Sequence, residues 1–229
     1  MPYKLLSLQV GKAKGYGERQ SQDFLTKYWE SGSFKEPTLE KLWAGKLGLE
    51  GDEVADKVHH GGEDKAIFAN SYENYGEWSE FLGKEIAFGA LSENLTISGL
   101  HESSVNLGDI HKIGEAILQV SQPRKPCWKI SKRWNNKKFT HEIYATGLTG
   151  WYYRVLEEGF IKAGSEVVLL SQEEEQVSIL DANMAFANPI MHREILEKIL
   201  NIPSLAPSYR TSIEKRIAGE FSLEYMRVD

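Results

Sequence analysis

The chain has 229 residues, of which 41% are hydrophobic and 26% are charged, and its formal charge is −6. This composition is typical of a globular protein long enough to bury a full core, and it argues against disorder. No segment has the roughly 18 consecutive apolar residues of a membrane span, and the N-terminus lacks the apolar stretch of a signal peptide, so we expect a soluble, cytoplasmic protein. Because there is a single cysteine, no disulfide can form within the chain.

The first half of the chain predicts short strands separated by turns. Residues 3–10 alternate between apolar and polar side chains and predict a strand that ends at Gly11. Residues 12–48 contain scattered glycines and predict a long connection with one short strand near residues 39–42. An apolar strand is expected at residues 66–69, and residues 71–82 have the i, i+3, i+4 spacing of an amphipathic helix that Gly83 would cap.

The second half continues this pattern and then changes to helices. Strands are predicted within residues 88–97 and at residues 116–120, a short helix at residues 151–158, and a buried strand at residues 167–170. Three short helices follow a glutamate-rich linker, at residues 178–187, 191–200 and 209–218. We therefore predict a mainly β protein, a barrel or sandwich over the first three quarters, with an appended helical unit for structure or partner docking.

The only cysteine lies in a stiff, cationic segment, residues 122–130. Pro123 and Pro126 restrict the backbone before Cys127, and the strand predicted at residues 116–120 runs straight into this segment. Neighbouring Arg124, Lys125 and Lys129 favour the thiolate, the form that acts as a nucleophile or metal ligand. The simpler alternative is a buried structural cysteine beside a solvated run of lysines.

Positive charge is concentrated in this region. Residues 124–138 contain seven Lys or Arg and no acidic residue, whereas the rest of the chain has 20 basic against 33 acidic residues. A cationic island on an acidic protein favours a small anionic ligand, and we expect no stable binding of nucleic acid.

A second candidate segment is His59-His60-Gly61-Gly62 with Lys65. The glycines allow close approach of the backbone to a ligand, and the imidazoles and Lys65 can donate hydrogen bonds to an anion, although a tight turn explains the glycines equally well. Adjacent histidines on an extended backbone point apart, so a zinc site is not expected. Asn94 is either a ligand-orienting amide or a turn residue.

Together these blocks resemble the MOSC domain, the module related to the C-terminal domain of molybdenum-cofactor sulfurase, and the helical ending resembles its YiiM-like subgroup. The resemblance rests on the following segments: Gly48-Leu49-Glu50-Gly51-Asp52, Asp56, His60-Gly61-Gly62, Asp64-Lys65-Ala66, Glu93-Asn94-Leu95-Thr96, Gly108-Asp109, and Gln122-Pro123-Arg124 with Pro126-Cys127. Ser92 stands where the family pattern has glycine. The implied organisation is a MOSC-type β-barrel with a few peripheral helices at residues 1–170, a linker at 171–177 and a small three-helix domain at 178–229.

The resemblance implies binding of the molybdenum cofactor, molybdopterin, and reduction of N-hydroxylated compounds such as 6-hydroxylaminopurine, a detoxification role. Cys127 would be the molybdenum ligand and His60 a proton donor. The cofactor would be held by Arg124, Lys125, Lys129, His59, Gly61, Gly62, Lys65 and Asn94. A separate reductase would supply electrons to a monomer or homodimer that contacts no membrane, and pyridoxal phosphate binding is not expected.

Two other functions fit the same residues. In one, Cys127 carries a persulfide, and the protein is a sulfur or cofactor carrier without turnover. In the other, the site is an anion pocket for a nucleotide or phosphorylated metabolite, and the cysteine is structural.

Overall fold

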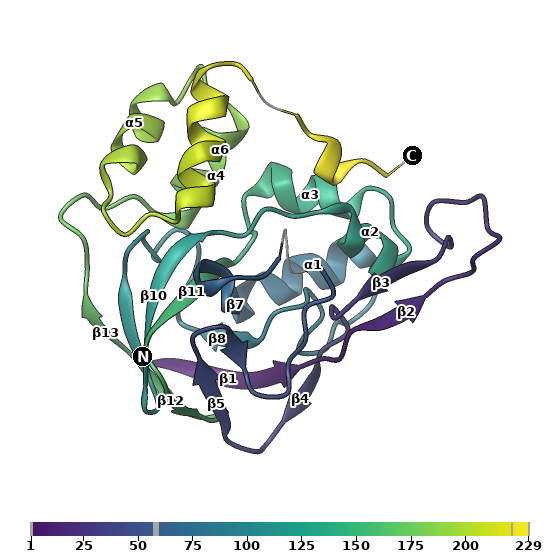
Figure 1. The fold of residues 1–229 in the computed structure, drawn as a ribbon, viewed down its shortest axis with the longest axis horizontal. Coiled ribbons are helices and arrows are strands. Elements are labelled where there is room, and N and C mark those ends of the chain that lie inside the picture. The colour runs from purple at the N-terminus through teal and green to yellow at the C-terminus, as the bar shows by residue number, and fades with distance from the viewer. Residues whose placement is uncertain (1, 57–59, 221, 229) are drawn as a thin grey trace.

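The computed structural model describes residues 2–56, 60–220 and 222–228, and its main feature is a closed β-barrel (Figure 1). Within the described residues, seven strands follow one another in the order β13-β9-β10-β11-β7-β8-β1, and pairing of β13 with β1 closes the circle; β4 extends the sheet beside β1. Among the described strands of this sheet, β7 and β8 alone pair in parallel. The bounds are β1 (Tyr3–Val10), β4 (Glu36–Thr38), β7 (Ile67–Ser71), β8 (Leu95–Ser98), β9 (Ile110–Ile113), β10 (Ala116–Pro123), β11 (Trp151–Glu157) and β13 (Glu166–Ser171).

The connection between β1 and β7 has more regular structure than the sequence predicts. A two-stranded hairpin projects from the barrel, and a three-stranded sheet lies below it. The hairpin consists of β2 (Lys14–Tyr16) and β3 (Trp29–Ser31). The three-stranded sheet consists of β5 (Leu42–Gly45) and β6 (Gly48–Leu49) from this connection and of β12 (Gly159–Ile161), which follows β11 in the chain. The strand expected near residues 39–42 is thus displaced, because pairing with β12 and β6 selects residues 42–45.

The helix predicted at residues 151–158 is wrong, since this segment forms β11 between β10 and β7. Its apolar residues fit both the 3.6-residue period of a helix and the two-residue alternation of a strand. In the barrel, Trp151, Tyr153 and Val155 alternate into the core with at most 3% exposure. Long-range pairing decides between the two patterns. The strand predicted at residues 167–170 forms as β13, but only Val167 is buried there, and the following three apolar residues are 38–49% exposed.

Three α-helices lie beside the barrel: α1 (Tyr75–Leu82), α2 (Trp128–Trp134) and α3 (Phe139–Thr146). Short 3-10 turns are η1 (Glu63–Lys65), η2 (Tyr72–Asn74) and η3 (Glu224–Met226). Helix α1 ends as predicted at Gly83, which adopts φ 65°. The sequence did not predict α2 and α3. They are separated by Asn135, whose left-handed φ of 49° ends α2.

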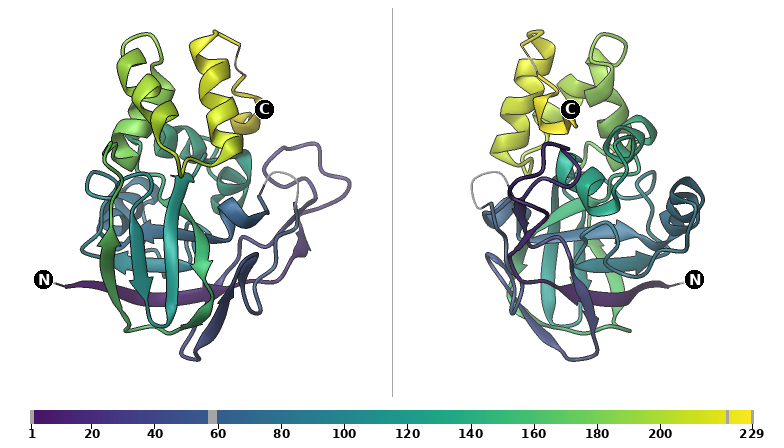
Figure 2. Two further views of the ribbon diagram at one scale, coloured as in Figure 1. Left: turned by 60° about the vertical axis from the view of Figure 1, so that its left-hand side comes forward. Right: turned by 90° about the vertical axis from the view of Figure 1, so that its right-hand side faces the viewer.

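The three C-terminal helices form as predicted, with small shifts in their bounds. They are α4 (Ile179–Ala187), α5 (Arg193–Asn201) and α6 (Pro207–Ile217). The Ser178 hydroxyl caps α4 by accepting a hydrogen bond from the Asp181 N–H at 3.0 Å. All three helices lie at one end of the barrel (Figure 2).

Their buried side chains, such as Ile179, Leu196 and Ile213, belong to the same apolar core as Leu118 and Val120 of β10. The predicted fold class, a mainly β barrel with a few helices and a C-terminal helical unit, is confirmed. No described helix is both long and apolar enough to span a membrane.

The barrel core contains a buried histidine, His111, from which we predict that the protein loses stability at acidic pH. His111 is 1% exposed, its Nδ1 lies 2.9 Å from the Tyr153 hydroxyl, and burial lowers its pKa to about 4. In the unfolded chain the imidazole binds a proton below about pH 6.5, so between these values the unfolded state binds more protons than the folded state. The free energy of unfolding should therefore fall as the pH falls, by roughly 2–3 kcal/mol between pH 7 and pH 4.5 from this residue.

Urea unfolding of wild type and His111→Gln at both pH values would measure this contribution. The variant should lose less stability on acidification than wild type. Equal losses would show that His111 is not the titrating group.

Candidate functional site

Strand β10 delivers the cysteine segment to the end of the barrel. The Arg124 N–H donates to the Gly150 carbonyl at 3.1 Å, and the Cys127 carbonyl accepts from the Thr140 hydroxyl at 3.2 Å. Cys127 itself has extended backbone angles and directly precedes α2. Its side chain is 9% exposed. A strand, a turn and a helix therefore hold the thiol in one position, as expected for a rigidly presented side chain.

The thiol lines a cavity of about 100 Å³. The wall opposite β10 comes from the connection between β1 and β7, and from the turn before β8. A second, larger cavity of about 720 Å³ shares residues 52–55 and Ala66 with the first. The cysteine cavity is lined by the following residues: Ser31, Gly32, Ser33, Lys35, Asp52, Glu53, Val54, Ala55, Asp56, His60, Lys65, Ala66, Phe68, Ser92, Asn94, Arg124, Cys127, Lys129 and Tyr152.

His60 lies within hydrogen-bonding reach of the thiol. Its Nε2 lies 3.8 Å from the Cys127 Sγ. Burial lowers the pKa of His60 to about 4, and the positive charges of Lys129 and Arg124 act in the same direction. At neutral pH the imidazole is therefore uncharged, so one ring nitrogen can donate a hydrogen bond and the other can accept one. The sequence-based proton-donor hypothesis relied on an ordinary histidine pKa, which this environment does not provide.

Three of the predicted cofactor-binding cations share the cavity with Cys127. They are Arg124, Lys129 and Lys65. Arg124 is 7% exposed, and its guanidinium lies 5.0 Å from the centre of the Phe68 ring. Burial also lowers the pKa of Lys65. The cavity thus combines one soft sulfur with hydrogen-bond donors suited to an anion.

Lys125 is not brought to this cavity. Its Nζ donates to the Ser212 hydroxyl of α6 at 3.0 Å and lies 5.5 Å from the centre of the Phe186 ring. Burial, together with nearby cations, lowers the pKa of Lys125 to about 8. Arg124 thus lines the cavity that holds Cys127 and Lys125 does not, although both line a small pocket beside α4 and α6.

The histidine–glycine segment is only partly at the site. His59 lies outside the described residues. Gly61 and Gly62 line the larger cavity and not the one that holds Cys127. Gly62 has φ 97°, a conformation that favours glycine.

Asn94 lines the cavity, but its side-chain amide is hydrogen-bonded to neighbouring segments of the protein. Its Oδ1 accepts from the Phe68 N–H at 3.1 Å, and its Nδ2 donates to Asp52 Oδ2 at 2.9 Å. Asp52 also forms an ion pair with buried Lys35 and accepts from the Gly11 N–H at 2.8 Å. The cross-links join β1, β7 and the turn before β8. No local pattern marked Lys35, because its partner is 17 residues away.

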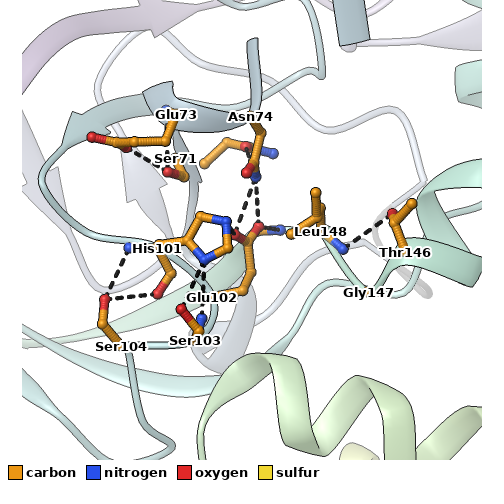
Figure 3. Close-up of polar contacts among 12 residues, drawn as sticks. Ser71, Glu73, Asn74, His101, Glu102, Ser103, Ser104, Thr146, Gly147 and Leu148 are labelled. Carbon is orange, nitrogen blue, oxygen red and sulfur yellow. Dashed lines mark hydrogen bonds and ion pairs between the residues drawn. The ribbon is translucent and has the colours of Figure 1, made fainter. Parts of the chain in front are cut away.

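Behind the site, the buried carboxylate of Glu102 fixes the turn that holds Arg124. Glu102 is 0% exposed and accepts from the Gly150 N–H at 2.8 Å and from Asn74 Nδ2 at 2.9 Å, with the His101 ring beside it (Figure 3). The Gly150 carbonyl in turn accepts from the Arg124 N–H. Burial raises the pKa of Glu102. The sequence analysis missed this residue, whose partners are distant in sequence.

Comparison with known proteins agrees with the fold. Residues 56–168 match the model of the MOSC domain. The chain is 38% identical to the uncharacterised protein YflK of Bacillus subtilis over 93% of its length and 94% of the relative's. It is 36% identical to YiiM of Escherichia coli, covering 79% of this chain and 82% of YiiM.

Two further similarities extend this result. The crystal structure of YiiM from Geobacillus stearothermophilus superimposes with a TM-score of 0.78 at 32% identity, covering 94% of this chain and 100% of that one. A protein of Gibberella moniliformis named reductase is 28% identical over 76% of this chain, which spans 31% of that protein. The chain belongs to the MOSC-domain family, and within it to the YiiM-like proteins.

We expect Glu102→Ala to destabilise the protein by about 2–4 kcal/mol, since it leaves the buried Gly150 N–H without its acceptor and leaves the Asn74 amide with only the long contact to Asn70 Oδ1 at 3.4 Å. Glu73→Ala is a matched control, because the exposed Glu73 carboxylate also accepts from a glycine N–H, that of Gly99 at 2.7 Å. Its expected cost is below about 1.5 kcal/mol. Similar costs for both variants, measured by urea unfolding, would contradict the structural role of Glu102.

Proposed function

We propose that this protein is a molybdenum-cofactor-dependent reductase of N-hydroxylated compounds, for which 6-hydroxylaminopurine is a test substrate. The observation that carries the proposal is the position of the Cys127 sulfur, in a cavity with His60 and the cations Arg124, Lys129 and Lys65. Membership of the MOSC family and the relative named reductase support it.

The residues of the cavity fit the cofactor. Among the described residues, no group of three or more His, Cys, Asp or Glu could hold a metal ion, so a metal at Cys127 would bring most of its ligands with it. A pterin dithiolene does so, and a thiolate is a suitable additional soft ligand. Arg124, Lys129 and Lys65 are suited to its anionic groups. The larger cavity that shares residues 52–55 provides further space.

The bound cofactor would supply two electrons for cleavage of the N–O bond. Cys127 would hold the metal through its sulfur, and the neutral His60 imidazole beside it can exchange a hydrogen bond with bound groups in the cavity. Arg124 and Lys129 would orient anionic groups in the cavity. The hydrogen bond from the Arg124 N–H to Gly150 keeps the segment that carries both Arg124 and Cys127 in place.

The electron donor is a separate reductase in this proposal. The sequence contains no flavin or iron–sulfur motif of its own, and reduction consumes two electrons in each turnover.

The first test concerns Cys127→Ser. Wild-type protein purified from cells that make the cofactor should contain near-stoichiometric molybdenum and pterin fluorescence, and the variant should lose most of its molybdenum because a hydroxyl is a poor ligand for a soft metal centre. Absence of molybdenum and pterin from wild type would contradict the reductase assignment. Cyanide-labile sulfur on Cys127 in such protein would identify the persulfide carrier instead.

A second test uses the adjacent cations Arg124 and Lys125, of which only Arg124 lines the cavity that holds Cys127. Arg124→Ala should weaken cofactor retention by about 10- to 100-fold, the effect of losing a charge-assisted hydrogen bond, whereas Lys125→Ala should retain it. Molybdenum content after extensive dialysis measures both. Equal retention by the two variants would show that Arg124 does not hold the cofactor.

A further inference from the structure

The positive charge near Cys127 extends beyond the cavity to the C-terminal helices. Lys125 lies outside the cavity that holds Cys127, and its Nζ donates to the Ser212 hydroxyl of α6 at 3.0 Å. Directly before α6, the Ala206 N–H donates to the Ser121 carbonyl of β10 at 3.1 Å. Strand β10 and α6 are thus fixed to each other beside the cysteine segment. The cofactor proposed for the cavity does not account for the charge of Lys125.

Helix α6 adds two cations to this region. Lys215 and Arg216 lie in its last turn. Their positive charges, together with that of Lys65, lower the pKa of Lys125, so the four side chains lie close enough to interact. Arg216 is only 3% exposed, whereas the Lys215 side chain is exposed to solvent. Lys215 is therefore the member of this group that is most open to a partner.

Other cations of residues 124–138 are used inside the protein. Lys132 and Arg133 both donate to backbone carbonyls of the connection between β1 and β7. By contrast, no described carboxylate forms an ion pair with Lys125, Lys129 or Lys215. These three lysines, hereafter the lysine face, lie at and beside the cysteine cavity.

Acidic groups near the lysine face reduce its charge only in part. Asp56 and Asp64 attract Lys65, and Asp64 also forms an ion pair with Arg154 at 2.7 Å. Glu214 is exposed on α6. The lysine face nevertheless stays positive, on a chain whose formal charge is −6.

A small anion enclosed beside Lys125 does not explain this charge. The small cavity that Lys125 lines has a volume of about 10 Å³, which is room for one water molecule. A phosphate or sulfate does not fit there. The exposed Lys215 is suited to a partner that contacts the surface of the molecule.

The proposed reduction requires an electron carrier at this end of the barrel. Each turnover takes two electrons and two protons, converts an N–OH group to N–H and releases water. Outside residues 124–138 the chain has 20 basic against 33 acidic residues, so an acidic carrier is repelled by much of the surface and attracted to the lysine face. A long nucleic acid would also cross the acidic surface, whereas a compact protein can contact the lysine face alone.

We propose that the lysine face is the docking surface for an acidic electron-carrier protein, a flavin or iron–sulfur protein that passes two electrons to the cysteine cavity. Such docking rests on the proposed reductase function and specifies the partner that this function needs. The carrier is oxidised by two electrons in all, in one or two encounters, and the two protons come from solvent. Helix α6 thus presents Lys215 to the carrier in addition to covering the end of the barrel.

The first test measures binding of two acidic carriers, a bacterial flavodoxin and a plant-type ferredoxin, to the full chain by calorimetry. In about 10 mM salt, Lys215→Glu should raise the dissociation constant about 3- to 10-fold, and Lys215→Gln should raise it less. In about 150 mM salt the Debye length falls to about 8 Å, so the difference between Lys215→Glu and wild type should shrink.

Lys112→Glu is the matched control for the same change of charge. Lys112 is exposed on β9 and pairs with Ile117, at the end of β10 remote from Cys127. Its dissociation constants should stay within about twofold of wild type, because an exposed charge far from the contact is screened. The melting temperature of each variant confirms that it is folded.

Activity separates docking from chemistry in protein loaded with the cofactor. Reduction of 6-hydroxylaminopurine by reduced flavodoxin or ferredoxin should slow in Lys215→Glu by the same factor as binding weakens. With dithionite-reduced methyl viologen the rate should not fall, because this small cation does not need the lysine face. Molybdenum content should equal that of wild type.

Three outcomes would overturn the docking surface. They are failure of wild type to bind either carrier in low salt, equal effects of Lys215→Glu and Lys112→Glu, and an equal loss of activity with carrier and viologen in Lys215→Glu. If the loaded protein reduces nothing with viologen, the proposed function fails. Salt-sensitive binding that depends on Lys215 would then still support the lysine face as a surface for acidic carriers.

Discussion

The structure depends on buried carboxylates that accept hydrogen bonds from the backbone N–H groups of irregular turns. Glu93 is 0% exposed and accepts from the Gly89 and Leu91 N–H groups at 2.9 Å each, and from the Tyr75 hydroxyl. Glu102 does the same for Gly150. A buried charge is costly unless it is fully hydrogen-bonded, so each carboxylate tolerates only one arrangement of its turn. In this way a barrel end made of loops gains the rigidity that a binding site requires.

This rigidity allows segments that are distant in sequence to form one cavity. Cys127 comes from the end of β10, Lys35 and Asp52 from the long connection after β1, and Asn94 from the turn before β8. The ion pair of Lys35 with Asp52 and the amide of Asn94 join these segments. Polar residues of the cavity therefore have two roles: some support the wall, and others face the ligand.

Local patterns in the sequence predicted the elements whose signals are local. Alternation predicted β1 with its correct bounds, Gly83 predicted the end of α1, and Ser178 begins the first C-terminal helix. The helix prediction at residues 151–158 failed because four apolar residues there satisfy both periods, and only the neighbouring strands select one. Residues 128–146 form two helices that the concentration of lysines and the lack of clear caps concealed.

The candidate site was predictable to a similar extent. Stiffness and charge around Cys127 identified the thiol, and proximity in sequence suggested Arg124 and Lys129. Proximity in sequence also suggested Lys125, which does not line this cavity. A position next to Arg124 in the sequence does not tell where the Lys125 side chain points. Glu102, Lys35 and Arg133 could not be found from local patterns, since their partners lie 17 to 100 residues away. The contacts of Lys125 have an evolutionary consequence. Lys125 joins the segment that carries Cys127 to α4 and α6, so substitutions at Ser212 or Phe186 are expected to co-vary with position 125.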